Sequence, residues 1–174
     1  MQSFTYNPPK VKNSTKMVSV TDSSGEFVCS FKRTYNNMFT RIADFFLSHN
    51  FFVQFDVFTE SGEIKYQGNK KPRWGKTQYK IVNLDNQEEY LVSYISWQTI
   101  SPEFLIKCTS GDEFTVKKDL MDWAKIYYNG KEVARWKMKT TELFKTYLEI
   151  EEHSPIKEPE FFICLFQCIF YIGD

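Results

Sequence analysis

Apolar and polar residues alternate along much of the chain, in short runs that are separated by turn residues. In one run Phe27, Cys29 and Phe31 share one face, while Ser30 and Lys32 share the other. The same alternation recurs in four further segments, at residues 53–57, 64–67, 104–108 and 113–117. Period-two alternation bounded by turns is typical of strands with one buried face. At least ten such strands can be placed, and this number predicts a β-barrel or a β-sandwich.

Turn residues fall between these runs at fairly regular intervals. Asn129-Gly130 is the strongest of these signals, because both central residues of a type I′ turn need a positive φ. The other turn segments are Asp22-Ser23-Ser24-Gly25, Glu60-Ser61-Gly62, Asp85-Asn86 and Ser110-Gly111-Asp112. We therefore expect the strands to be joined mainly as antiparallel hairpins.

Residues 37–48 depart from this alternation and predict a short surface helix. Asn36 or Asn37 is available as its N-cap. Its apolar residues follow helical spacing, and they are Met38, Ile42, Phe45 and Phe46. We expect this stripe to pack on the barrel wall, as the apolar face of a surface helix usually does. The alternative is that the stripe binds a partner.

Residues 161–172 form a second departure, a run that only Gln167 interrupts with a polar side chain. Ile, Phe and Tyr favour strands, but the run is too long for a usual strand. Pro159 suits a first helical position, Glu160 complements the positive end of a helix, and Gly173 can cap the last turn. We predict a helix that is enclosed in the core, because it is apolar all round. A helix of about 18 Å is too short for the ~30 Å hydrocarbon layer of a membrane.

The order of several motifs resembles a known family. The motifs are the basic-aromatic Phe31-Lys32-Arg33-Thr34-Tyr35, then Phe55-Asp56-Val57-Phe58-Thr59-Glu60-Ser61-Gly62, Lys71-Pro72-Arg73-Trp74-Gly75-Lys76, Asn129-Gly130-Lys131-Glu132-Val133-Ala134, Thr146-Tyr147-Leu148-Glu149-Ile150 and the apolar helix before Asp174. Over roughly residues 15–174, the chain resembles the bacterial tubby C-terminal-domain-like proteins, relatives of the plant LURP-one-related proteins and of phospholipid scramblases. The resemblance implies a closed antiparallel barrel of about twelve strands around a hydrophobic C-terminal helix. Phe4–Tyr6 would then supply a strand beyond those that the alternation shows.

The length of 174 residues favours one domain that spans residues 1–174. Within it, residues 1–14 are expected to form an N-terminal arm or an extra strand. Residues 159–173 are expected to form the central apolar helix.

Charge is unevenly distributed although the formal net charge is zero. Residues 1–80 contain 12 Lys and Arg against 6 Asp and Glu, and the remainder contains 10 against 16. This asymmetry predicts one basic face. It does not predict a nucleic-acid partner, since a nucleic-acid-binding domain is usually basic throughout.

The N-terminal sequence lacks a charged segment followed by an apolar one, so we expect no secretory signal. No apolar run approaches the ~18 residues of a membrane span. The four cysteines are Cys29, Cys108, Cys164 and Cys168. Because we expect no secretory signal, we expect these cysteines to be reduced, buried side chains of a cytoplasmic protein.

Residues that could carry catalysis or bind a metal are scattered. His49 and His153 stand apart from other ligand types. Cys164 and Cys168 are four residues apart and share a helix face. We interpret them as core residues, and the alternatives are a metal site or palmitoylation. We interpret the carboxylates Glu149, Glu151 and Glu152 as a solvated acidic turn, and the alternative is a pair of acid–base groups. We therefore predict no catalytic residue, no metal site and no cofactor.

One basic segment remains as a candidate site, and we call residues 70–76 the basic hairpin. Basic side chains around a tryptophan can bind phosphate headgroups while the indole lies at the membrane interface. The candidate residues are Lys70, Lys71, Arg73, Trp74 and Lys76, with Lys65 and Lys80 expected nearby. The alternative is an ordinary solvated hairpin loop.

The family resemblance, together with the basic hairpin, implies a non-enzymatic binding or scaffold barrel that docks reversibly on anionic membrane lipid. Phosphoinositide-like lipid is the class that the resemblance to tubby domains implies. Such a protein would be cytoplasmic and peripheral at the membrane. One alternative is a protein–protein interaction module that uses the 37–48 helix or a barrel rim. Another is scramblase-like lipid handling, which rests on the resemblance alone.

Overall fold

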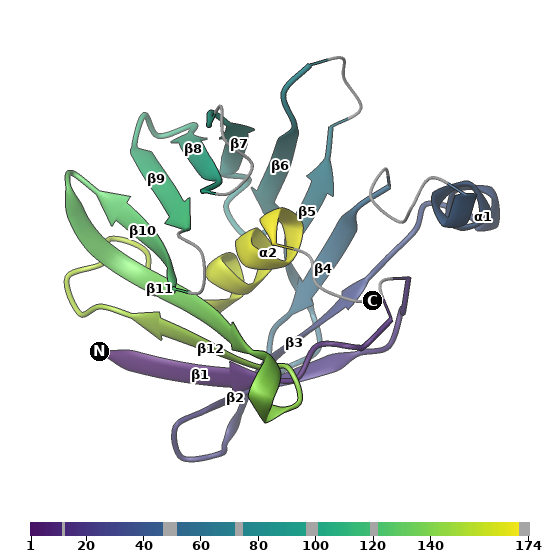
Figure 1. Cartoon of the computed structure of the whole chain (residues 1–174), viewed down its shortest axis with the longest axis horizontal. Helices are drawn as coiled ribbons and strands as arrows, with labels where there is room; N and C mark the ends of the chain where they lie inside the picture. The colour runs from purple at the N-terminus through teal and green to yellow at the C-terminus, as the bar shows by residue number, and fades with distance from the viewer. Residues whose placement is uncertain (12, 47–51, 72–74, 97–100, 119–121, 171–174) are drawn as a thin grey trace.

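The computed structural model describes residues 1–11, 13–46, 52–71, 75–96, 101–118 and 122–170. Within them, antiparallel strands close into a barrel of twelve (Figure 1). The strands are β1 (Gln2–Tyr6), β2 (Val18–Asp22), β3 (Phe27–Arg33), β4 (Gln54–Phe58), β5 (Ile64–Lys70), β6 (Gln78–Asn83), β7 (Glu89–Tyr94), β8 (Glu103–Cys108), β9 (Glu113–Lys118), β10 (Ala124–Tyr128), β11 (Lys131–Lys139) and β12 (Lys145–Ile150). A 3₁₀ turn, η1 (Thr140–Glu142), joins the last two strands, and two α-helices complete the fold. The barrel confirms the predicted fold class.

The first strand closes the barrel by pairing with the last. Gln2 lies opposite Ile150 and Tyr6 opposite Thr146, while the other edge of β1 pairs with β2. Phe4–Tyr6 thus supplies the additional strand that the resemblance implied. Because closure pairs both edges of each strand, it removes the free edges on which other chains could add strands.

The predicted turns lie where the hairpins need them. Asn129 and Gly130 join β10 to β11 with φ values of 49° and 76°, the two positive φ angles of a type I′ turn. In the turn after β2, Asp22 Oδ1 accepts hydrogen bonds from the backbone N–H of Ser24 and of Glu26, at 2.9 and 3.0 Å. Local sequence therefore determines these connections.

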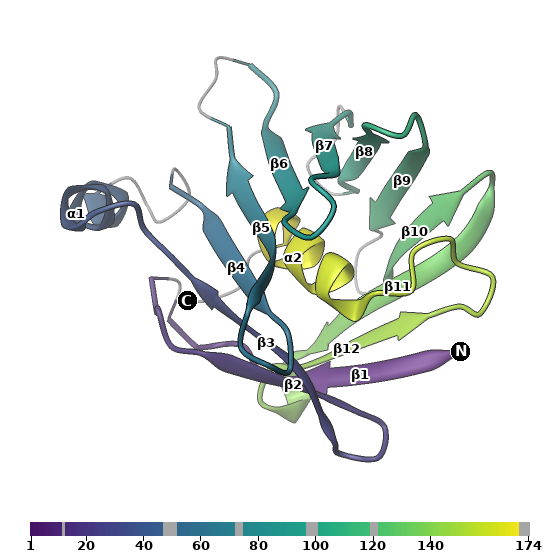
Figure 2. The same cartoon turned by 180° about the vertical axis from the view of Figure 1, so that it is seen from behind.

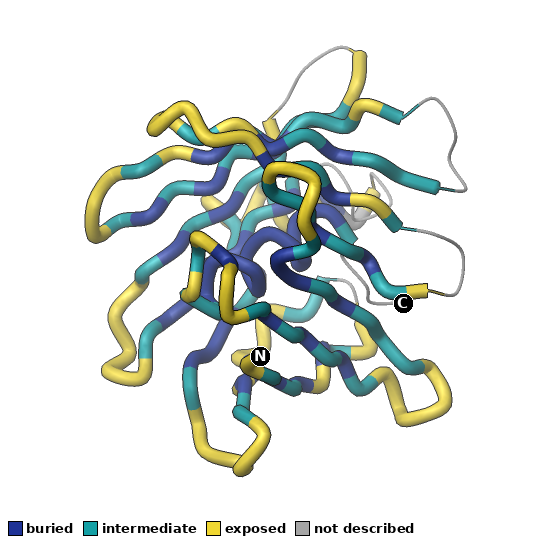
Figure 3. The backbone as a smooth tube through the Cα atoms, turned by 90° about the vertical axis from the view of Figure 1, so that its left-hand side faces the viewer, coloured by how far each residue is buried: buried dark blue, intermediate teal, exposed yellow. Residues whose placement is uncertain are grey.

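The second helix, α2 (Pro159–Ile169), lies inside the barrel and fills its lumen (Figures 1 and 3). Every residue from Glu160 to Ile169 is buried. Phe166 stacks on Trp136 with ring centroids 5.4 Å apart, and Phe161 packs on Tyr90 at 4.5 Å. The enclosed apolar helix is therefore confirmed, with Pro159 in its first turn. The predicted cap Gly173 lies outside the described residues.

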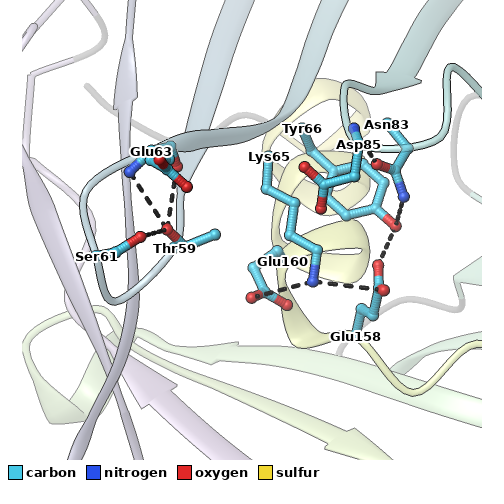
Figure 4. Close-up of polar contacts among 9 residues, drawn as sticks. All are labelled: Thr59, Ser61, Glu63, Lys65, Tyr66, Asn83, Asp85, Glu158 and Glu160. Carbon is cyan, nitrogen blue, oxygen red and sulfur yellow. Dashed lines mark hydrogen bonds and ion pairs between the residues drawn. The ribbon is translucent and has the colours of Figure 1, made fainter.

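Polar contacts hold both the start and the middle of α2. At the start, Lys65 Nζ lies 3.4 Å from Glu158 Oε1 and 3.7 Å from Glu160 Oε1, and Tyr66 donates a hydrogen bond to Glu158 (Figure 4). In the middle, Gln167 Nε2 donates to the Tyr6 hydroxyl at 2.8 Å. The single polar residue of the apolar run therefore has a buried partner, as a buried amide requires.

The first helix, α1 (Met38–Phe46), confirms the predicted helix between β3 and β4. Asn37 is its N-cap, since its Oδ1 accepts the backbone N–H of Thr40 at 2.8 Å. Figures 1 and 2 show α1 projecting from the outside of the barrel, away from the other elements.

The two ends of the barrel differ in their connections. Five tight turns and the segment that leads into α2 lie at one end, which we call the hairpin end: residues 23–26, 59–63, 84–88, 109–112, 129–130 and 151–158. The remaining connections lie at the other end, which we call the long-loop end, and their described residues are 7–11, 13–17, 34–46, 52–53, 71, 75–77, 95–96, 101–102, 122–123 and 140–144. Helix α1 and the basic hairpin therefore share the long-loop end.

Candidate functional site

The apolar stripe of α1 faces away from the barrel. Met38 is 76% exposed, Phe39 82%, Ile42 49% and Phe46 79%. On the opposite side of the same helix, Asp44 is completely buried. The expectation that the stripe packs on the barrel wall is therefore wrong for the described side chains; that of Phe45 lies outside them.

A buried carboxylate explains this inverted orientation. Asp44 Oδ2 accepts hydrogen bonds from Arg33 Nη2 at 2.6 Å and from the Tyr35 hydroxyl at 3.1 Å. Its Oδ1 accepts the backbone N–H of Phe52 at 2.9 Å. A buried charge is tolerated only when it is paired and hydrogen-bonded, so this network fixes which side of α1 faces inwards. The apolar side chains of Met38, Phe39 and Ile42 lie on the other side of the helix and are exposed.

The basic hairpin begins beside the hydrogen-bond network of Asp44. Lys70 is the last residue of β5 and is half-buried, and burial lowers the pKa of its ammonium group while the nearby charge of Asp44 raises it in part. Lys70 also lines a pocket of about 410 Å³ together with Tyr35, Thr40 and Phe52. The structure thus brings the first residue of the basic hairpin next to α1.

The other members of the basic hairpin are only partly placed. Lys71 and Lys76 are exposed, and Lys76 Nζ donates a hydrogen bond to the Ile95 carbonyl at 3.0 Å. Arg73 and Trp74 lie outside the described residues, so their part in the site stays a prediction.

The two lysines that we expected near the basic hairpin differ in their positions. Lys65 lies near the hairpin end of β5, where it contacts the carboxylates at the start of α2. Lys80 pairs with Glu89 across β6 and β7, at 2.6 Å. The expectation is therefore wrong for Lys65, which lies towards the opposite end of its strand. It is confirmed for Lys80, which lies opposite Asn69 at the start of the basic hairpin and lines a pocket with Lys71.

Charge is segregated between the two ends of the barrel. The connections of the hairpin end hold one basic residue, Lys157, against nine carboxylates: Glu26, Glu60, Glu63, Asp85, Glu88, Asp112, Glu151, Glu152 and Glu158. Over the described residues, the connections of the long-loop end hold three carboxylates, of which Asp44 is buried against Arg33, and five basic residues: Lys10, Lys16, Arg41, Lys71 and Lys76. Four lysines on the last or first residues of strands border this end as well: Lys70, Lys118, Lys139 and Lys145. The basic face is thus an end of the barrel and not a half of the sequence.

Exposed apolar side chains gather at the same basic end. Over the described residues, three large exposed ones lie at the hairpin end: Met1, Phe27 and Ile64. Nine lie at the long-loop end: Val11, Met17, Met38, Phe39, Ile42, Phe46, Ile95, Leu143 and Phe144. Basic and apolar groups on one surface suit an anionic lipid interface, which offers both charge and hydrocarbon.

Two of these exposed apolar residues also have an unusual backbone conformation. Leu143 and Phe144 both adopt left-handed conformations, with φ values of 55° and 66°. Such values are uncommon outside glycine and cost about 1–2 kcal/mol per residue. The connection between β11 and β12 therefore holds Leu143 76% exposed, with Lys139 and Lys145 on either side.

The other candidates of the sequence are spread over the fold. Glu149 pairs with Arg135 at 2.5 Å and Glu152 with the N-terminal amine at 2.8 Å, so the carboxylates near the start of α2 are not one site. His153 is exposed at the hairpin end, and His49 lies outside the described residues. Among the side chains that the structure describes, no group of three or more His, Cys, Asp or Glu is arranged to hold a metal ion.

Comparison with known families identifies the family of this chain. The family model of the Tubby C-terminal like domain matches residues 4–172. The chain belongs to this family. No curated protein and no solved structure matches it significantly. Of the helices in the described part of this tubby-like barrel, none is long and apolar enough to cross a membrane.

Two features of the tubby-like barrel escaped the sequence analysis. One is the pair of Arg33 and Asp44, for which a signal existed: Arg33 continues the inward alternation of Cys29 and Phe31, and an inward charge requires a partner. The other is the segregation of charge by barrel end. It becomes visible only when every second connection is assigned to the same end, which requires the complete order of strands.

Proposed function

We propose that this tubby-like barrel is a non-enzymatic binding protein that docks reversibly on anionic membrane lipid, with its long-loop end towards the bilayer. The observation that carries the proposal is the polarity of the barrel, with basic and exposed apolar residues at one end and nine carboxylates at the other. The candidate contacts in the basic hairpin are Lys70, Lys71, Arg73, Trp74 and Lys76.

The separation of charge between the two ends matters because the net charge of the chain is zero. A uniform distribution of these charges would give no attraction to an anionic surface, whereas a dipolar one orients the basic end towards it. Each basic residue near such a surface contributes about 1 kcal/mol. The exposed lysines and arginine of the long-loop end can therefore support a weak, reversible association that salt reduces.

The filled lumen favours surface docking over a ligand held inside the barrel. Residues Glu160–Ile169 are buried along the axis, and the aromatic rings of Tyr66, Tyr90 and Trp136 pack against them. Because α2 occupies the space that a lipid tail would need, we do not propose lipid transport through the barrel.

Vesicle co-sedimentation tests the proposal. Vesicles that contain phosphatidylserine or a phosphoinositide should sediment the protein, vesicles of phosphatidylcholine alone should sediment far less, and raising salt well above ~0.15 M should release it. The double variant Lys71→Glu/Lys76→Glu should bind at least tenfold more weakly. Lys70 is left unchanged in this variant, because it is half-buried beside Asp44.

The matched control carries the same charge change at the opposite end. Lys131→Glu/Lys157→Glu alters two exposed lysines at the hairpin end and should leave binding within about twofold of the wild type. Equal loss in both double variants would mean that net charge, and not the long-loop end, governs binding. Binding that survives high salt and the Lys71/Lys76 reversal would refute the proposal.

A further inference from the structure

We propose that α1 is the element of this barrel that enters the bilayer, lying in the plane of the interface with Met38, Phe39, Ile42 and Phe46 at the boundary between headgroups and acyl chains. This inference rests on the proposed docking and adds to it how the contact is made. It converts a purely electrostatic association into one with an inserted apolar element.

The arrangement of side chains around α1 is that of an interfacial helix. At about 100° per residue, Met38, Ile42 and Phe46 form one row and Phe39 lies beside it. These four side chains are 49–82% exposed, whereas Asp44 projects almost opposite and is buried. The nine residues of α1 extend about 14 Å, far less than the ~30 Å of a hydrocarbon core. Such a helix can lie in the interface but cannot cross it.

The barrel holds α1 in this orientation before any lipid is present. The Asp44 carboxylate is bound to β3 through Arg33 and to the segment before β4 through the Phe52 N–H. Rotating the apolar row onto the barrel would pull this carboxylate out of its network, which is costly for a buried charge. The apolar row is thus presented outwards in advance, which reduces the ordering cost of binding.

Charge complementarity selects an anionic bilayer as the occupant of this face. Arg41 is exposed on α1 itself. Lys70 lies near Asp44, and Lys71 and Lys76 follow in the basic hairpin. A second copy of the chain is disfavoured, because a symmetric contact through α1 would bring two basic ends together. An anionic lipid surface satisfies both the apolar row and the basic residues around it.

Depth-dependent quenching with brominated lipids tests the insertion directly. Phe39→Trp places an indole beside the exposed row, at a position that is 82% exposed, and Phe27→Trp places one at the hairpin end, where Phe27 is 41% exposed. The fluorescence of wild type, measured in parallel, accounts for the native tryptophans. With anionic vesicles that contain lipids brominated along the acyl chain, the added fluorescence of Phe39→Trp should be quenched, and that of Phe27→Trp should not.

A binding measurement on unlabelled variants provides the second readout. Phe39→Ser should weaken binding to anionic vesicles about tenfold, because burying one large apolar side chain changes an equilibrium constant by at least that factor. Phe27→Ser removes the same group from the other end and should change binding less than twofold. Both residues are surface-exposed, so both variants are expected to fold, which thermal melting verifies.

Each outcome separates this inference from the proposed function. Vesicle binding without quenching of Phe39→Trp would overturn the insertion while leaving electrostatic docking intact. Failure of the wild type to bind anionic vesicles at all would overturn both. Self-association in solution that Phe39→Ser abolishes would show that a second copy covers α1, and would also overturn the insertion.

Discussion

The guanidinium of Arg33 donates a 2.6 Å hydrogen bond to the carboxylate of Asp44, and the two side chains are 1% and 0% exposed. This pair joins a strand of the barrel to a helix that otherwise projects into solvent. Because the helix makes this buried contact through a charge, the apolar side chains of Met38, Phe39 and Ile42 are exposed on its other side. The pair therefore connects the stability of the fold to the geometry of the proposed docking end.

Replacing Asp44 with alanine should destabilise the protein strongly. The change leaves the Arg33 guanidinium buried without its carboxylate, which typically costs about 3–5 kcal/mol. For a domain of this size, such a loss lowers Tm by about 6–20 °C. As a control, Glu103→Ala breaks the exposed pair of Glu103 with Lys117 and should cost at most about 1 kcal/mol. Equal Tm values for Asp44→Ala and wild type would show that the pair does not anchor α1.

Truncating Phe166 should have a similarly large effect, for a different reason. Phe166 is fully buried in the lumen and stacks on Trp136. Phe166→Ala leaves a cavity and should cost about 3–5 kcal/mol of unfolding free energy, measured by urea titration. Phe39→Ala deletes the same atoms from an 82% exposed position and should change stability by less than about 0.5 kcal/mol. Comparable losses in the two variants would contradict the enclosed helix.

The sequence predicted the elements well because their signals are local. Alternation gave the strands, Asn129-Gly130 gave its hairpin, and the apolar run that starts at Phe161 gave the central helix. The exact closure of the barrel came from family resemblance, since pairing of β1 with β12 joins residues almost 150 positions apart. The orientation of α1 was predicted wrongly, because helical periodicity shows that a helix has an apolar face but not where that face points.

Of the candidate site, the basic hairpin was visible in the sequence as a cluster of charges. Its spatial relation to α1 was not, because Lys70 and Asp44 meet only through the antiparallel pairing of β3, β4 and β5. Lys65 shows the converse error, since it is close to the basic hairpin in the sequence but contacts Glu158 near the other end of its strand.

Gly68 marks a close approach between the barrel wall and its central helix. A Cβ atom at this position would lie 2.5 Å from Cys168 Sγ and 2.7 Å from Cys164 Sγ. Gly68→Ala should therefore destabilise the fold by about 1–3 kcal/mol, as overpacking of a dense core does. Combining it with Cys164→Ala and Cys168→Ala removes both sulfur atoms, so the triple variant should lose less stability than the sum of the separate changes. Additive losses in urea titrations would show that Gly68 and the two cysteines do not meet.

The four cysteines should react slowly, and the pH dependence of labelling should show why. Cys29, Cys164 and Cys168 are at most 1% exposed, and burial raises the pKa of the Cys29 and Cys164 thiols well above the ordinary value. Cys108 is only half-buried, and burial, reinforced by Glu88 and Asp112, raises its pKa to about 12. Because the thiolate is the reactive form, iodoacetamide should label Cys108 first and the other three only after unfolding.

The rate of Cys108 labelling tests the pKa itself. Below its pKa the thiolate fraction of a thiol grows about tenfold per pH unit. With a pKa of about 12, the rate for Cys108 should therefore keep rising across the range from about pH 8 to about pH 10. An ordinary thiol with a pKa of about 8.5 would level off within that range. Mass spectrometry of labelled peptides follows each cysteine separately, and denatured protein supplies the ordinary profile. A plateau for native Cys108 near pH 9, or prompt labelling of Cys164 in the native state, would contradict the buried environment described for these residues.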